Sequence, residues 1–125
     1  MPTWIAICLG ASTGALARWQ LGLWLNTSAA SLPWGTLVAN WTGAYAIGAL
    51  VVWFNAHPGL DAVWRAALIT GLLGALTTFS TFSAEALALM QQGRWAWALL
   101  HSGLHLIGSV ALAAAGMVIT QRWLG

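Results

Sequence analysis

The sequence predicts an all-α membrane protein, a single four-helix domain over residues 1–125, and three observations lead to this class. Hydrophobic residues make up 60% of the chain and charged residues 5%, with a mean hydropathy of +0.80, which excludes an ordinary soluble domain. The apolar residues form four runs, each long enough to cross a hydrocarbon core, which takes about 20 residues of helix. Most of the ten tryptophans lie at or near the ends of these runs, at the depth of the lipid headgroups: Trp4, Trp24, Trp34, Trp53, Trp64, Trp95, Trp97 and Trp123.

The four runs are separated by residues that favour turns. The first run, residues 4–25, is followed by Asn-Thr-Ser; it lacks a basic leader and three more runs follow, so we do not expect a signal peptide. The second, residues 35–54, is closed by Asn-Ala-His-Pro-Gly. The third and fourth, residues 63–91 and 97–123, are separated by a short segment that contains Gln-Gly-Arg.

The third run is longer than a membrane requires. As continuous helix, residues 63–91 would span roughly 43 Å at about 1.5 Å per residue, against a hydrocarbon core of about 30 Å. Steep tilt would accommodate this length, and so would a break near the midpoint, where Gly71, Gly74 and Thr77-Thr78 lie. Broken helices at this depth mark ion and substrate sites, because their freed carbonyls and amides can coordinate ions. We therefore expect a break in the third helix.

The arginines do not specify an orientation in the membrane. Four spans place Arg65 and Arg122 on one side and Arg18 and Arg94 on the other, and the chain has no lysine, so the positive-inside rule gives a tie. Sparse charges alone could produce this tie. Dual topology, in which monomers insert both ways and pair head to tail, would also produce it. Both interpretations remain open on charge alone.

Two function classes are disfavoured by composition. The basic pI comes from four arginines against Asp61 and Glu85 rather than from a basic patch, so we expect no nucleic-acid partner. The single cysteine, Cys8, excludes an intrachain disulfide, and its apolar surroundings predict a buried packing residue.

Residues 77–83 read Thr-Thr-Phe-Ser-Thr-Phe-Ser, five hydroxyls and two phenylalanines at membrane depth, where polar groups need partners or a water-lined cavity. Phe79 and Phe82 share a helix face, and the positive edge of an aromatic ring can favour an anion. Hydroxyls donate hydrogen bonds without a charge that would trap the ion. A pore for a small, hard anion is therefore plausible, although two phenylalanines at this spacing could also simply pack.

Glycines around the expected break have two interpretations. If two copies pair antiparallel, carbonyls from the 74–77 stretch of both would converge on one point and suit a dehydrated monovalent cation. Alternatively, Gly71 and Gly74 allow close helix packing, as the G-x-x-x-G pair Gly10 and Gly14 does in the first span.

Other polar residues in the spans are also candidates. Asn40 offers two N–H donors to an anion, or a hydrogen bond between helices. Glu85 could couple protons, pair with an arginine or line a vestibule, and its position past the break favours the vestibule. His101 and His105 have the i, i+4 spacing of metal ligands, but no carboxylate or cysteine lies near them in sequence. We expect these histidines at a wet or interfacial face.

The string Thr-Thr-Phe-Ser-Thr-Phe-Ser-Ala-Glu at 77–85 closely resembles the signature of the CrcB/Fluc family of fluoride channels. The resemblance extends in order along the chain, through residues 14–19, the Gly35-Thr36-Leu37 segment with Asn40 and Gly43, and Gly108-Ser109. It implies an antiparallel, dual-topology homodimer in the bacterial inner membrane, with two pores that export fluoride passively and no enzymatic activity or catalytic residues.

The resemblance also implies roles for individual residues. A structural sodium ion at the dimer interface would be held by the backbone carbonyls of Gly74 and Thr77. The vestibule would contain Arg18 and Glu85. The residues implied to line the fluoride pore are Phe79, Phe82, Asn40, Ser80, Thr81, Ser83 and Ser109.

A small dual-topology, proton-coupled drug exporter is the alternative function. Such an exporter needs a carboxylate near the midplane, usually early in the chain, and the first run has none. A purely structural subunit would leave the hydroxyl-rich segment unexplained.

Overall fold

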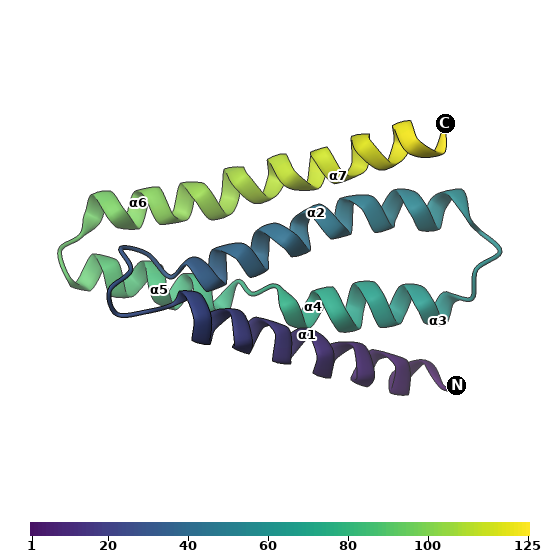
Figure 1. The fold of residues 1–125 in the computed structure, drawn as a ribbon, viewed down its shortest axis with the longest axis horizontal. Coiled ribbons are helices and arrows are strands. Elements are labelled where there is room, and N and C mark those ends of the chain that lie inside the picture. The colour runs from purple at the N-terminus through teal and green to yellow at the C-terminus, as the bar shows by residue number, and fades with distance from the viewer.

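The computed structural model describes residues 1–125 as four long helical segments that run up and down beside one another (Figure 1). Both termini and the 57–61 loop lie at one end, and the other two loops lie at the opposite end. The all-α prediction is confirmed, and the segments begin and end within two residues of the expected runs. The elements, with η denoting π-helix, are α1 (Thr3–Leu25), α2 (Trp34–Ala56), α3 (Ala62–Arg65), η1 (Ala66–Leu73), α4 (Gly74–Leu76), α5 (Ser80–Gln91), α6 (Trp95–Gly103), η2 (Leu104–Gly108) and α7 (Ser109–Leu124).

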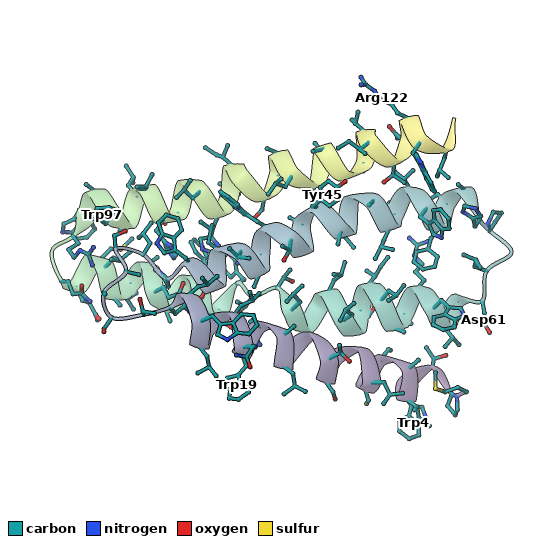
Figure 2. The ribbon with its side chains drawn as sticks, in the orientation of Figure 1. Trp4, Trp19, Tyr45, Asp61, Trp97 and Arg122 are labelled. Atoms are coloured by element: carbon teal, nitrogen blue, oxygen red, sulfur yellow. The ribbon has the colours of Figure 1, made fainter.

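Three segments are long and apolar enough to cross a membrane: Trp34–Ala56, Ala62–Gln91 and Trp95–Leu124. Helix α1 has 23 residues, about 34 Å at 1.5 Å per residue, and so has the length to cross as well. Figure 2 shows Trp4 and Trp97 at opposite ends of the molecule, as membrane-interface anchors would lie. The chain is a multi-pass membrane protein.

Glycines bring the helices into close contact in the half of the molecule near the termini. A Cβ atom added to Gly10 would overlap the Ala67 carbonyl oxygen, and one added to Gly71 would lie 2.6 Å from a carbonyl oxygen of α1. A Cβ atom added to Gly48 would likewise overlap a carbonyl oxygen of α7, and one added to Gly116 would overlap a carbonyl oxygen of α2. The packing interpretation of Gly71 is therefore correct, and these glycines set how closely the helices pack.

The third segment is broken at residues 77–79. Helix α4 ends at Leu76, Thr77 adopts an extended conformation (φ −81°, ψ 155°), and helix resumes at Ser80. The predicted break is thus confirmed close to the expected position. The π-helical stretches η1 and η2 were not predicted.

One chain buries little of its own surface: 18 of 125 residues are buried. Cys8, expected to be a buried packing residue, is exposed, because α1 contacts its neighbours along a narrow face and leaves the rest of its apolar surface open. Much apolar surface is therefore left for lipid or for another protein.

Candidate functional site

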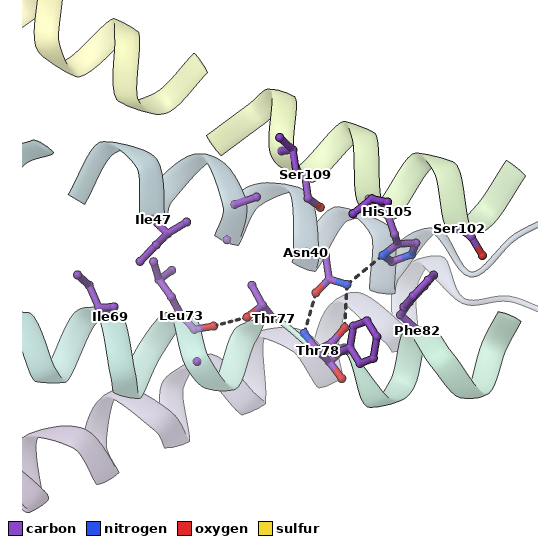
Figure 3. A pocket seen from close by; sticks show the side chains of 16 residues that line it. Asn40, Ile47, Ile69, Leu73, Thr77, Thr78, Phe82, Ser102, His105 and Ser109 are labelled. Atoms are coloured by element: carbon purple, nitrogen blue, oxygen red, sulfur yellow. Dashed lines mark hydrogen bonds between the residues drawn. The ribbon is translucent and has the colours of Figure 1, made fainter. Parts of the chain in front are cut away.

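A cavity of about 720 Å³ lies beside the break, between α2, the broken third segment and the fourth segment. Its walls differ from one end to the other (Figure 3): Ile47, Ile69 and Leu73 form one end, and polar and aromatic groups form the other. The polar and aromatic lining comprises Asn40, Thr77, Thr78, Phe79, Phe82, Ser102, His105 and Ser109.

Asn40 bridges α2 to the break. Its Oδ1 accepts a hydrogen bond from the Thr78 N–H at 2.7 Å, and its Nδ2 donates to the Thr78 carbonyl at 2.9 Å. This two-point contact fixes which way the amide faces. The remaining hydrogen of Nδ2 is then directed at His105 Nδ1, 3.0 Å away, which must accept it. A neutral His105 therefore carries its proton on Nε2. Both N–H donors of Asn40 are occupied, so the amide shapes the site rather than offering free donors.

Two hydrogen bonds at the break, one of them to Asn40, release backbone carbonyls. In an unbroken helix Thr78 N–H would bond the Gly74 carbonyl, but it donates to Asn40 instead. Likewise Thr81 N–H donates to Thr78 Oγ1 at 3.1 Å rather than to the Thr77 carbonyl. The Gly74 and Thr77 carbonyl oxygens thus lose their helical donors and are free to accept other partners. This arrangement fits a hard cation, which binds oxygen ligands.

The packing interpretation of Gly74 finds no support. A Cβ atom added there would lie 3.6 Å from its nearest neighbour, an ordinary van der Waals distance. Gly74 therefore differs from Gly71, which is required for contact with α1.

The two phenylalanines lie next to each other, with ring centroids 5.7 Å apart and ring planes at 58°. Phe82 also packs against His101 and His105, at centroid distances of 5.4 and 4.6 Å. Phe79 is 80% exposed, an unusual state for a phenylalanine beside a cavity. Phe82 is therefore held in place by this chain, whereas Phe79 is available to a partner molecule.

A second polar group lies between α2, α5 and α6. Thr36 Oγ1 donates to Glu85 Oε1 at 2.5 Å and accepts from Asn26 Nδ2 at 3.2 Å. The other carboxylate oxygen, Oε2, lies 3.3 Å from His101 Nε2. Glu85 forms no ion pair with an arginine, so that option for its role is excluded within one chain.

The expectation for the histidines is wrong. His101 and His105 are 1% and 6% exposed, not at a wet or interfacial face. The reason is tertiary: α5 brings Glu85 and Phe82 against the fourth segment and covers both rings.

The predicted site residues divide into two groups. Those that line the cavity are Asn40, Gly74, Thr77, Phe79, Phe82 and Ser109. Those that do not are Ser80, Thr81, Ser83, Arg18 and Glu85. Among the second group, Ser83 Oγ donates to the Phe79 carbonyl at 2.8 Å, and Ser80 and Thr81 are exposed.

Sequence reasoning missed Thr36, Ser102 and the cavity position of His105. Thr36 lies one helical turn before Asn40, and His105 one turn after His101, so helical spacing could have placed them beside the residues that were found.

Comparison with known proteins identifies related sequences. Residues 5–117 match the family model described as CrcB-like protein, Camphor Resistance (CrcB). The fluoride-specific ion channel FluC of Albidiferax ferrireducens is 59% identical over 113 residues, which cover 90% of this chain and 86% of that protein. The proteins of the same name from Pseudomonas syringae pv. maculicola and Aromatoleum aromaticum are 50% and 45% identical, over 94% and 100% of this chain and 92% and 95% of theirs.

Proposed function

This chain belongs to the CrcB-like family, and we propose that it is a fluoride-selective ion channel that lets fluoride leave the cytoplasm passively. Relatives described as fluoride-specific ion channels match over most of the chain, with up to 59% identity. A negative-inside membrane potential suffices to drive the anion out, at about 2.3 kcal/mol per charge per 100 mV. We place the protein in the bacterial inner membrane, where such a potential exists.

The composition of the cavity wall carries this proposal. No lining residue is an arginine, lysine, aspartate or glutamate, so the anion would meet hydroxyl donors and ring edges instead of a fixed charge. Thr78, Ser102 and Ser109 supply hydroxyls. Conduction requires binding strong enough to admit the ion and weak enough to release it. Neutral donors and the edges of Phe79 and Phe82 would meet both requirements.

The functional unit that we propose is an antiparallel homodimer with two pores. The exposed Phe79, and the exposed Ser80 and Thr81 beside it, would complete a pore against the partner, which explains why Ser80 and Thr81 do not line the cavity of one chain. Pairing about an axis in the membrane plane also accounts for the tie among the arginines.

A structural sodium ion at the dimer interface belongs to the same proposal. The Gly74 and Thr77 carbonyls, which lack their helical donors, are the groups that would hold it. When bound, the ion would offset the negative ends of the carbonyl dipoles that meet there. Asn40 keeps the Gly74 carbonyl available because it accepts from the Thr78 N–H, and the Thr78 hydroxyl keeps the Thr77 carbonyl available because it accepts from the Thr81 N–H.

Efflux from liposomes tests the proposal. Purified protein is reconstituted with internal fluoride, and a potassium ionophore removes the opposing voltage. We expect rapid fluoride efflux, little chloride efflux from matched vesicles, and no requirement for a proton gradient. Efflux that needs a proton gradient would instead support the proton-coupled exporter, and equal fluoride and chloride fluxes would contradict selectivity.

A further inference from the structure

Three buried polar atoms at the Glu85–His101–His105 cluster have no hydrogen-bond partner: Glu85 Oε2, His101 Nε2 and His105 Nε2. One ligand atom from each residue lies within 4.8 Å of the others. Buried polar atoms are normally satisfied, so three unsatisfied atoms at one place indicate a missing occupant. The hydrogen bonds of Glu85 to Thr36 and of His105 to Asn40 use other atoms, Oε1 and Nδ1, and so do not satisfy these three.

The 3.3 Å between His101 Nε2 and Glu85 Oε2 is an ion-pair distance, and it is also the spacing expected of two ligands on one metal ion. These two atoms are not aligned for a hydrogen bond. Two ligands on a tetrahedral Zn²⁺, each about 2.0–2.2 Å from the metal, would be roughly 3.3–3.6 Å apart. The set of two histidines and one glutamate is also one that zinc uses, with a fourth position left for water. The carboxylate that the sequence lacked near the histidines is supplied by the fold.

We propose that Glu85, His101 and His105 bind a divalent transition metal such as Zn²⁺, and that the bound metal blocks the ion path. The proposed block of the ion path rests on the proposed channel function. His105 lines the cavity, so the cluster adjoins the proposed ion path.

Metal binding competes with the contact between Asn40 and His105. Ligation through Nε2 moves the remaining imidazole proton to Nδ1, where it would face the Asn40 amide nitrogen, now 3.0 Å away. Two donors cannot share a hydrogen bond, so the Asn40–His105 bond must open when the metal binds. Because Asn40 also holds the break at Thr78, the metal disturbs the cavity wall as well as adding positive charge beside it.

Calorimetry with Zn²⁺ on the detergent-purified full chain tests binding without reference to flux. We expect the unmodified protein to bind Zn²⁺, and His101→Gln to weaken binding by at least about tenfold, since even residues that only orient a ligand contribute 10–100-fold. His57→Gln is the matched control, because His57 lies outside the cluster and contacts Trp53. Glu85→Gln, which preserves side-chain size, is the second variant in case His101→Gln does not fold. Equal zinc affinity in the unmodified protein and in the folded cluster variants would overturn the site.

Fluoride flux from liposomes tests whether the bound metal blocks the ion path. Zinc inhibition is expressed relative to each variant's own zinc-free fluoride flux, and we expect it in the unmodified protein and in His57→Gln but at least tenfold weaker in His101→Gln. Zinc that binds by calorimetry but leaves fluoride flux unchanged would overturn the blocking role. Absence of fluoride flux without zinc would contradict the channel function, while calorimetry would still decide the metal site.

Discussion

The two halves of this bundle are built from different interactions. In the half that holds the termini and the 57–61 loop, helices meet through glycines such as Gly10 and Gly71. In the half that holds α5 and α6, they are joined by side-chain hydrogen bonds, and every such bond between different segments involves residues 26–41 or 78–105. One chain thus concentrates its side-chain hydrogen bonds between segments at one depth.

This difference explains why a single chain is an incomplete channel. An ion path must cross the whole membrane, yet the cavity is apolar at the end lined by Ile47, Ile69 and Leu73. In an antiparallel pair, the polar half of one chain would lie at the depth of the glycine-packed half of the other. The proposed dimer would therefore offer polar groups at both depths.

The largest effect is expected at the two phenylalanines. Phe79→Ile and Phe82→Ile, made separately, retain apolar bulk but remove the ring edge, and we expect fluoride flux to fall by about two orders of magnitude, equivalent to about 2.7 kcal/mol of barrier. Stability should change by less than about 1.5 kcal/mol if each variant elutes as one species. Fluoride electrode measurements on liposomes with equal protein content report the flux. Wild-type flux in both folded variants would show that the rings only pack.

Fixing the orientation of the chain tests the antiparallel pairing. Two lysines inserted after Leu124 should hold the C-terminus inside, and we expect flux from this variant expressed alone to fall by about tenfold or more. A variant with lysines at Gln91 and Gln92 should be biased the opposite way, since these residues lie at the other end of the bundle. Co-expression of the two should restore flux. Full activity of either variant alone would contradict dual topology.

Asn40 and Asn55 allow a matched comparison on one helix, since they lie in the polar half and near the terminal end of α2, respectively. Asn40→Leu leaves the N–H and carbonyl of Thr78 without partners, so we expect roughly tenfold lower flux and a lower melting temperature. Asn55 is exposed and forms no side-chain hydrogen bond to another segment, so Asn55→Leu should change neither the fluoride flux nor the melting temperature. If the two variants behave alike, the hydrogen bonds of Asn40 do not organise the break.

The glycine-packed half and the break illustrate what the sequence can predict. Helix ends follow from local apolar periodicity and turn residues, and the excess length of residues 63–91 requires a tilt or a break. These features depend on neighbours along the chain. The π-helical stretches η1 and η2 were not predicted.

The polar half was predicted less completely, because its contacts join distant residues. Glu85 meets Thr36 and His101, which lie 49 positions before it and 16 positions after it, and a single sequence carries no signal for such pairs. Hence the histidines were expected at a wet face, and the choice for Asn40 between donating to an anion and bonding between helices, which the structure shows, was left open. The pore roles of Ser80, Thr81 and Ser83 and the vestibule roles of Arg18 and Glu85 remain predictions.

The smallest effect on flux is expected at the two third-segment glycines, which separate packing from carbonyl access. Gly71→Ala places a methyl group 2.6 Å from the Ile7 carbonyl oxygen, so the backbone must shift, and we expect a loss of about 1–3 kcal/mol of stability. Gly74→Ala meets nothing closer than 3.6 Å and keeps its carbonyl, so the melting temperature should be unchanged or slightly higher, since alanine favours helix over glycine. Both folded variants should conduct fluoride at near the wild-type rate per molecule. Tryptophan fluorescence during heating reports the melting temperature. A loss of stability at Gly74 as large as at Gly71 would mean that the break also relies on glycine for packing, and the glycine-packed region would then include residue 74.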